Sequence, residues 1–294
     1  MSWSEVCISV AREQAPLAEL VLEQQGALAV TMQDDQDHPV LEPGPGATPL
    51  WPSVRVRGLF NADIARGAIT QAIQAFVGIQ RPELIAWSEL DDQDWERVWM
   101  DRFAPMQFGE HLWIVPSGMQ IPFSEHNIEI HLDPGLAFGT GTHPTTALCL
   151  QWLDGRDVSG WHVVDYGCGS GILGLAAALK GAAGVVCVDN DPQALEASTE
   201  NAVRNQVSDL IECQSPQDYC ENSADLVLAN ILAGPLLELA PLLLASVKPG
   251  GMIVLSGILE EQAESVSEAY QAGCETINQQ ELDGWVRLDF QLRP

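Results

Sequence analysis

The second half of the chain alternates short apolar runs with amphipathic segments, and this alternation limits the possible folds more than any other feature. Apolar, β-branched runs predict strands, whereas apolar residues spaced by three or four positions predict helices. Strand and helix in repeated alternation indicate a parallel sheet with helices on both faces, the doubly wound α/β fold. The predicted strands are 162–166, 184–189, 210–213, 225–230 and 252–256, and the predicted helices are 171–180, 192–205, 235–247 and 260–271. Residues 275–292 predict an antiparallel pair at one sheet edge, around the turn 282–284.

A glycine-rich turn, DYGCGSG at 165–171, joins the first of these strands directly to a helix. Glycines let the backbone approach a ligand closely, and the start of a helix offers unpaired N–H groups. The pattern Gly-x-Gly-x-x-Gly from Gly169 also matches the dinucleotide fingerprint, with Asp189 twenty residues later, so a dehydrogenase is one interpretation. A turn that only packs the strand on the helix is another. The carboxylate of Asp165 would repel a pyrophosphate and favours a cationic ligand such as S-adenosylmethionine, whose ribose hydroxyls Asp189 can hold.

A second polar position, Asn230, ends the fourth strand of this part. Ligands of parallel sheets bind outside the carboxyl ends of the strands, so Asn230 is expected in the same crevice as Gly167 and Asp189. An amide there can accept a hydrogen bond from an amine without adding charge, which makes Asn230 the candidate catalytic residue. The alternative is an asparagine that only forms the turn before a helix.

The first 90 residues predict a small α+β domain of ferredoxin-like type, with elements in the order β-α-β-β-α-β. The predicted strands are 3–10, 27–32, 53–60 and 83–88, and the predicted helices are 13–25 and 62–77. Glycines at 26 and 78 end the two helices. No cluster of reactive side chains occurs in this part of the sequence, so we assign it to substrate recognition.

An acidic helix with Trp95 and Trp99, expected at 91–102, connects this domain to the rest. Two short strands are expected after Pro105, and they lead into the loop 132–146, where Thr142 is a plausible helix cap. We expect these two strands at 111–115 and 127–131. The expected domains are therefore a recognition domain at 1–90, a connector at 91–107 and a ligand-binding α/β domain at 108–294.

Net charge is the one abnormal feature of the composition, at −28, with 41 acidic and 13 basic residues. Such a field repels phosphate backbones, so direct binding of nucleic acid is not expected, whereas a basic protein would be attracted. Solubility, or adaptation to a salty cytoplasm, explains the same charge without any partner.

The seven cysteines show no Cys-x-x-Cys pair, which predicts free thiols in a reducing compartment and neither disulfides nor a metal site. The start of the chain has no long apolar block, so no signal peptide is expected. The longest apolar stretch, 235–247, is too short to span a membrane and contains Glu238. A cytoplasmic protein is expected.

Three motifs together resemble the family of bacterial ribosomal protein L11 methyltransferases: LDPGLAFGTGTHPTT at 132–146, DYGCGSG at 165–171 and NILA at 230–233. The resemblance spans nearly the whole chain and implies a seven-stranded Rossmann-like methyltransferase domain that uses S-adenosylmethionine. It implies trimethylation of lysine side chains and of the α-amine of that basic ribosomal protein. The cofactor contacts that it implies fall on Thr145, Gly167, Gly169 and Asn230 in these motifs, and on Asp189, the acid after the second strand.

Methyl transfer to an amine requires the neutral form, and a free lysine with a pKa of ~10.4 is mostly charged at pH 7. An apolar slot beside a sulfonium would lower that pKa through desolvation and like charge, so no dedicated base is demanded. We assign none, and expect a structural role for His143 in the first turn of a helix. A small-molecule or nucleic-acid methyltransferase, and a regulatory module that senses the cofactor without turnover, remain the alternatives.

Overall fold

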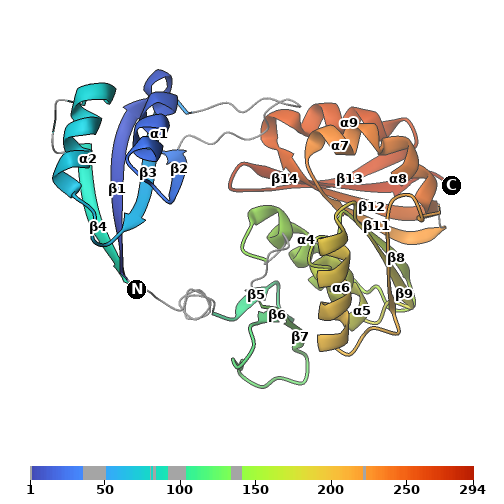
Figure 1. Ribbon diagram of the computed structural model, residues 1–294. Coiled ribbons are helices and arrows are strands. Elements are labelled where there is room, and N and C mark those ends of the chain that lie inside the picture. Colours follow the sequence, from blue (N-terminus) through green and yellow to red (C-terminus); the bar gives the residue numbers. More distant parts are fainter. Residues whose placement is uncertain are drawn as a thin grey trace. The chain divides into compact units, whose positions relative to one another are not determined.

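The computed structural model describes residues 2–35, 51–79, 81, 84–91, 104–133, 141–220 and 223–294. The chain divides into two compact units, Met1–Trp95 and Glu96–Pro294 (Figure 1). Of the predicted connector helix, only Asp91 belongs to the described residues, so Trp95 and Trp99 lie outside them.

The first unit contains an antiparallel sheet with the strand order β2-β3-β1-β4. Its elements follow the predicted order of strand, helix, strand, strand, helix and strand. They are β1 (Ser2–Ala11), η1 (Arg12–Gln14), α1 (Ala15–Gln24), β2 (Ala29–Asp34), β3 (Ser53–Asn61), α2 (Arg66–Ala72), η2 (Ile73–Val77) and β4 (Ile85–Asp91). Gly78 follows η2 with φ 81°, a left-handed conformation that glycine adopts without strain, as predicted for the helix end.

Buried and less buried residues alternate along β3, so one face of this sheet packs against the helices. Val54, Val56 and Phe60 of β3 are fully buried and join a core with Leu22 of α1 and Ile73 of η2. The first unit therefore has a hydrophobic core of its own.

The second unit is built on a seven-stranded sheet with the order β10-β9-β8-β11-β12-β14-β13. The first five strands in that order run parallel, and β14 and β13 are antiparallel, as the hairpin around Asp283 and Gly284 predicts. The strands are β8 (His162–Tyr166), β9 (Gly184–Val188), β10 (Ile211–Gln214), β11 (Ala224–Asn230), β12 (Val247–Leu259), β13 (Cys274–Leu282) and β14 (Trp285–Leu292).

Helices cover both faces of this sheet (Figure 1). Val163 of β8 belongs to the core under α4, α5 and α6, whereas its neighbour Val164 belongs to the core under α7, α8 and α9. Adjacent residues of a strand point to opposite faces, so a strand buried on both sides carries an unbroken apolar run. The helices are α4 (Pro144–Asp154), α5 (Ile172–Leu179), α6 (Pro192–Arg204), α7 (Ala233–Glu238), α8 (Ala240–Ser246), η4 (Glu260–Gln262) and α9 (Ala263–Gln271).

In two places this unit contains more elements than predicted. The helix expected at 235–247 is two helices, because Pro241 lies at the start of α8, where it lacks the N–H needed to continue α7. The region after Pro105 contains three strands instead of two, and they form a separate sheet with the order β5-β6-β7. These strands are β5 (Met106–Phe108), β6 (Leu112–Val115) and β7 (Ile128–His131).

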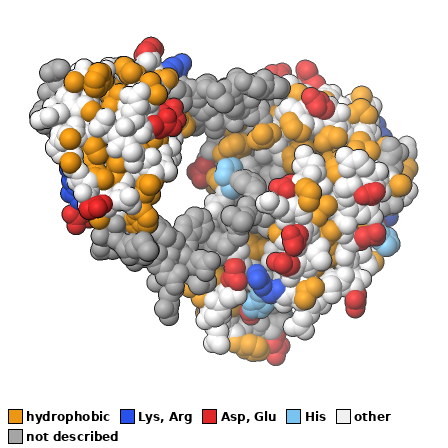
Figure 2. Space-filling model, in the orientation of Figure 1, with side chains coloured by type: hydrophobic (Ala, Val, Ile, Leu, Met, Phe, Trp, Pro, Cys, Tyr) orange, Lys and Arg blue, Asp and Glu red, His pale blue; other side chains and the backbone are white. Residues whose placement is uncertain are grey.

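All seven cysteines are free, and none of the described helices is long and apolar enough to cross a membrane. Figure 2 shows acidic side chains spread over the visible surface of both units, so the negative charge is not confined to one segment.

Candidate active site

A cavity of about 820 Å³ opens at the carboxyl ends of β8, β9 and β11. Its lining includes all five residues predicted to bind the cofactor: Thr145, Gly167, Gly169, Asp189 and Asn230. Crevices at this edge of a parallel sheet are the usual ligand sites of the fold. The structure thus brings together residues that are up to 85 positions apart in the sequence, from Thr145 to Asn230.

The glycine turn at 167–171 needs glycine for its backbone shape. Gly167, Gly169 and Gly171 have φ values of 77°, 54° and 77°, in the left-handed region that other residues rarely adopt. A Cβ atom on Gly167 would also collide with the side chain of Ile231, which lines the same cavity. The turn is held in place by the N–H groups of Gly167 and Cys168, which donate to the carbonyl of Val188 at 2.7 and 3.1 Å.

Asp189 follows β9 and is fixed by two backbone donors. Its Oδ2 accepts from the N–H of Gly169 at 2.9 Å, and its Oδ1 accepts from the N–H of Asp191 at 3.0 Å. Asp191 in turn caps α6 by accepting from the N–H of Gln193. The carboxylate that lines the cavity is therefore held by backbone N–H groups.

Asp165 does not face this cavity, and the prediction that its charge attracts a cationic ligand is wrong. The side chain is 1% exposed, and its Oδ2 accepts from the N–H of Gly174 in α5 at 2.9 Å. Burial raises the pKa of Asp165 to about 7, so the carboxyl is only partly ionised at pH 7, and it is not among the residues that line the cavity. It fixes the strand to the following helix.

Asn230 ends β11 and points to the start of α4, where its Nδ2 donates to Thr146 Oγ1 at 3.2 Å. Ser256 Oγ holds the same turn from β12 by donating to the carbonyl of Thr145 at 3.1 Å. The cap of α4 is His143 and not Thr142 as predicted, because the His143 side chain accepts from the N–H of Thr145. Burial lowers the pKa of His143, which keeps its ring neutral at pH 7.

One wall of the cavity is apolar. It is formed by Ile231, Leu232, Pro235, Leu239 and Trp285. The Trp285 ring packs edge-on against the His143 ring, with centroids 4.9 Å apart and planes at 71°. Sequence reasoning missed Trp285, because it follows a turn in an edge hairpin and no motif surrounds it.

Comparison with known proteins addresses the nature of this site. The family model described as "Ribosomal protein L11 methyltransferase (PrmA)" matches residues 2–293. A protein of that name from Methylococcus capsulatus is 50% identical over 289 residues, which cover 97% of this chain and 98% of that protein. One from Pseudomonas paraeruginosa is 49% identical over 294 residues, covering 100% and 99%. The chain belongs to the PrmA family.

A solved structure of a PrmA relative supports the fold as well. The ribosomal protein L11 methylase from Lactobacillus delbrueckii has 32% identity and a TM-score of 0.60, and the match covers 65% of this chain and 100% of that one. The α/β unit is thus a Rossmann-like methyltransferase fold, and the dehydrogenase interpretation is wrong.

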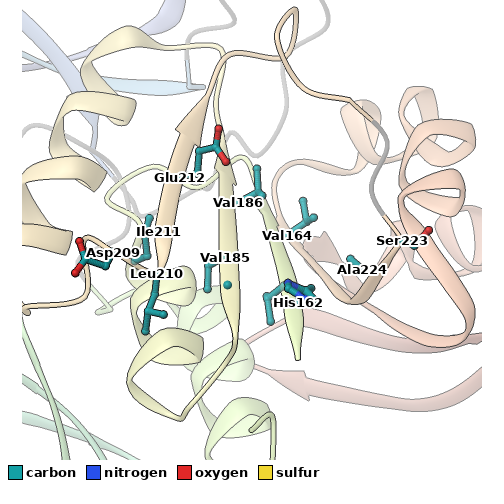
Figure 3. Close-up of a pocket in the computed structure, with 12 residues that line it drawn as sticks. His162, Val164, Val185, Val186, Asp209, Leu210, Ile211, Glu212, Ser223 and Ala224 are labelled. Carbon is teal, nitrogen blue, oxygen red and sulfur yellow. The ribbon is translucent and has the colours of Figure 1, made fainter. Parts of the chain in front are cut away.

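A second cavity, of about 470 Å³, lies at the other end of the PrmA sheet (Figure 3). It is lined by the first residues of β8, β9, β10 and β11: His162, Gly184, Ile211 and Ala224. None of the five predicted site residues is among its lining residues. Because the amino ends of parallel strands are not where such sheets bind ligands, the cavity at the carboxyl ends is the candidate active site.

Proposed function

We propose that this PrmA member transfers methyl groups from S-adenosylmethionine to amines of ribosomal protein L11, up to trimethylation of lysine side chains and of the α-amine. The observation that carries the proposal is the single cavity in which Thr145, Gly167, Gly169, Asp189 and Asn230 meet an apolar wall. The names of the relatives supply the acceptor protein.

S-adenosylmethionine is the methyl donor, and the residues of the cavity fit it. Gly167 and Gly169 line the cavity without side chains, which permits close approach of a ligand to the backbone. The Asp189 carboxylate keeps lone pairs beyond its two backbone donors, and these can accept from vicinal ribose hydroxyls. When bound, the cofactor supplies an electrophilic methyl group on a sulfonium.

The residues around the acceptor position favour a neutral amine. The amide nitrogen of Asn230 donates to Thr146, which leaves Oδ1 as the atom to accept from an amine proton. Leu232, Pro235 and Trp285 exclude water from the approach, and burial in an apolar slot disfavours the charged form of an amine. Alignment of the amine with the methyl group at ~3–3.5 Å lowers the barrier further, so Asn230 acts by orienting the acceptor and not as a base.

We assign residues 1–90 to recognition of the protein substrate, 91–107 to a connector and 108–294 to the methyltransferase domain. The strand order β2-β3-β1-β4 supports a ferredoxin-like domain in the first part. Its helices expose apolar side chains, with Leu17 and Leu20 on α1 and Phe76 on η2. Glu19 and Glu23 also lie on α1, which suits a basic protein partner more than nucleic acid. We expect the enzyme to act in the cytoplasm.

Labelled cofactor tests this function. The full-length protein is incubated with methyl-labelled S-adenosylmethionine and a lysate of cells that lack the enzyme, and the labelled products are identified by mass spectrometry. Label on ribosomal protein L11 supports the proposal. Label on RNA or on small molecules alone supports the corresponding alternative, and cofactor binding without any product supports a sensor.

A further inference from the structure

Helix α6 and its C-cap residue carry three buried polar side chains, beside an arginine whose side chain is 39% exposed. Ser198, Asn201 and Asn205 are 1%, 8% and 8% exposed, and Arg204 is adjacent to them. Positions 198, 201 and 205 share one face of the helix, because residues three or four apart lie above one another. Buried polar side chains of this kind are retained when they hold specific partners.

Two of these side chains donate hydrogen bonds to the glycine turn of the candidate active site. Ser198 Oγ donates to the carbonyl of Gly169 at 3.0 Å, and Asn201 Nδ2 donates to the carbonyl of Ser170 at 2.9 Å. The N–H of Gly169 already donates to Asp189. Consecutive peptide groups of the turn are therefore fixed from α6 on one side and from the end of β9 on the other.

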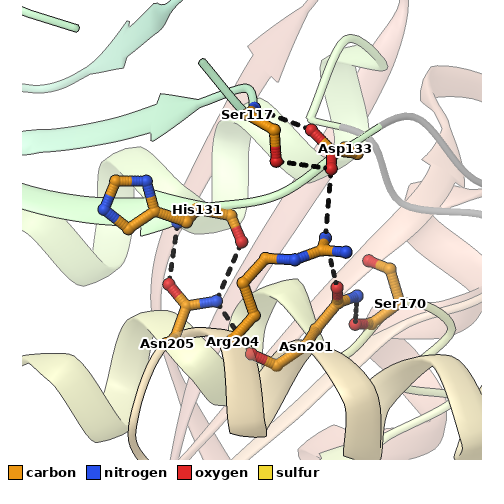
Figure 4. A network of polar contacts seen from close by, with 7 residues as sticks. All are labelled: Ser117, His131, Asp133, Ser170, Asn201, Arg204 and Asn205. Atoms are coloured by element: carbon orange, nitrogen blue, oxygen red, sulfur yellow. Dashed lines mark hydrogen bonds and ion pairs between the residues drawn. The ribbon is translucent and has the colours of Figure 1, made fainter. Parts of the chain in front are cut away.

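The other two hold the segment that ends β7 (Figure 4). Asn205 accepts from the N–H of His131 at 2.7 Å and donates to its carbonyl at 2.9 Å. Arg204 Nη1 lies 3.5 Å from Asp133 Oδ2, and Asp133 also accepts from the N–H and the hydroxyl of Ser117, each at 2.7 Å. Burial opposes ionisation of Asp133, but the Ser117 hydrogen bonds and the Arg204 charge outweigh it and lower its pKa.

Arg204 joins the two groups of contacts. Its Nη1 donates to Asn201 Oδ1 at 3.2 Å, so the oxygen of that amide faces the guanidinium and its nitrogen faces the carbonyl of Ser170. A guanidinium has only donors, and a reversed amide would place an NH₂ group against it and an oxygen against a carbonyl. The orientation of Asn201 thus depends on Arg204, and that of Arg204 on Asp133.

We propose that Arg204 is a positioning residue for the cofactor: with Asp133 and Asn201 it sets the place of the glycine turn, although it does not line the cavity. The inference rests on the proposed use of S-adenosylmethionine. Among the described residues, the chain Ser117–Asp133–Arg204–Asn201–Ser170 runs from the loop after β6 to the turn that contacts the ligand. A substitution at Arg204 should therefore weaken cofactor binding by displacing the backbone of the glycine turn.

The test is Arg204→Met in the full-length protein, since methionine keeps an apolar stem and removes every donor. We expect the Kd for S-adenosylmethionine, measured by calorimetry without acceptor, to rise about tenfold, the loss of roughly one well-oriented hydrogen bond. Amide hydrogen exchange in the ligand-free protein should accelerate at 168–171. In turnover, KM for the cofactor should rise while KM for the acceptor stays constant.

The matched control is Arg156→Met. Arg156 lies over the ring of Trp152 at 5.3 Å and is outside the network, so its removal should leave cofactor affinity and exchange at the turn unchanged. A double-mutant cycle adds Asp133→Asn, which should cost little more in a chain that already carries Arg204→Met.

Wild-type affinity in a folded Arg204→Met protein would overturn the positioning role, as would additive effects with Asp133→Asn. An equal loss of affinity in both arginine variants, or a loss that only follows a lowered Tm, would show that Arg204 stabilises the fold in general. Either result would also overturn the positioning role. If the wild-type protein itself fails to bind S-adenosylmethionine, the proposed function is wrong; if it binds and only the variant prediction fails, that function stands.

Discussion

The carboxylate of Asp189 accepts a hydrogen bond from the backbone N–H of Gly169 at 2.9 Å, across 20 positions of sequence. This contact makes the acid after β9 and the glycine turn after β8 a single unit. A ligand that enters the cavity therefore meets a backbone and a carboxylate whose relative positions are already set, which lowers the entropy that binding must overcome.

Asp189→Ala should weaken S-adenosylmethionine binding about 10- to 100-fold, because a charge-assisted hydrogen bond is worth ~1.5–3 kcal/mol. Calorimetry on the folded variant measures this. Asp209→Ala is the control, since it removes the same charge at the second cavity, at the amino end of the sheet. Equal affinity in the two variants would remove Asp189 from the cofactor site.

Gly167→Ala should lower Tm and impair cofactor binding. The substitution strains a backbone with φ 77° and drives a methyl group into Ile231, at an expected cost of about 1–3 kcal/mol. Gly234→Ala is its counterpart, because a Cβ there has no atom within 4 Å and lies in α7, where alanine is favoured. Thermal unfolding gives the Tm of both variants. A Gly167→Ala protein with the same Tm as Gly234→Ala would contradict the geometry.

Asp165 should make stability depend on pH. Burial raises its pKa to about 7 in the folded state, against 3.8 for an unburied aspartate, so the folded state binds its proton more tightly. Stability from this group is complete below about pH 4 and is lost as pH rises towards 7. Asp165→Asn removes the titration, so its free energy of unfolding relative to wild type should rise over that range by up to about 4 kcal/mol. Denaturant unfolding at pH 5 and pH 8 tests this, and a constant difference would show that Asp165 is not buried as described.

A shortened chain that begins at Pro105 should bind S-adenosylmethionine with nearly full affinity and fail to methylate ribosomal protein L11. Every residue lining the candidate active site follows residue 142, whereas residues 1–90 are assigned to recognition. Calorimetry and a methylation assay on the same preparation give both results. Full-length rates from the shortened chain would disprove the recognition role of the first domain.

The parts of the site that sequence could supply are those whose position follows from chain geometry alone. Gly167 and Asp189 directly follow parallel strands and Asn230 ends one, and the carboxyl ends of parallel strands must share an edge. Asp165 shows the limit of this reasoning. It lies one residue before Tyr166, where β8 ends, and its side chain contacts the N–H of Gly174 instead of the cavity. One position along a strand reverses the face, and the sequence does not show where the last strand residue lies to within one position.

The other differences between prediction and structure also depend on conformation that the sequence does not show. The predicted helix 235–247 includes Pro241, because apolar residues continue on both sides of the proline. Thr142 and His143 are both able to cap a helix, and only the backbone conformation decides between neighbours. Trp285 reaches the cavity through sheet order, which places β14 beside β12, and no feature around the tryptophan reports that pairing.

The most direct measurement is the intact mass of purified ribosomal protein L11 after incubation with this protein and S-adenosylmethionine. Our account predicts a mass increase in steps of three methyl groups, with fragments that place them on lysine side chains and on the α-amine, and a large loss of product with Asp189→Ala. An unchanged mass of ribosomal protein L11, under conditions in which the protein binds the cofactor and methylates another acceptor, would contradict it.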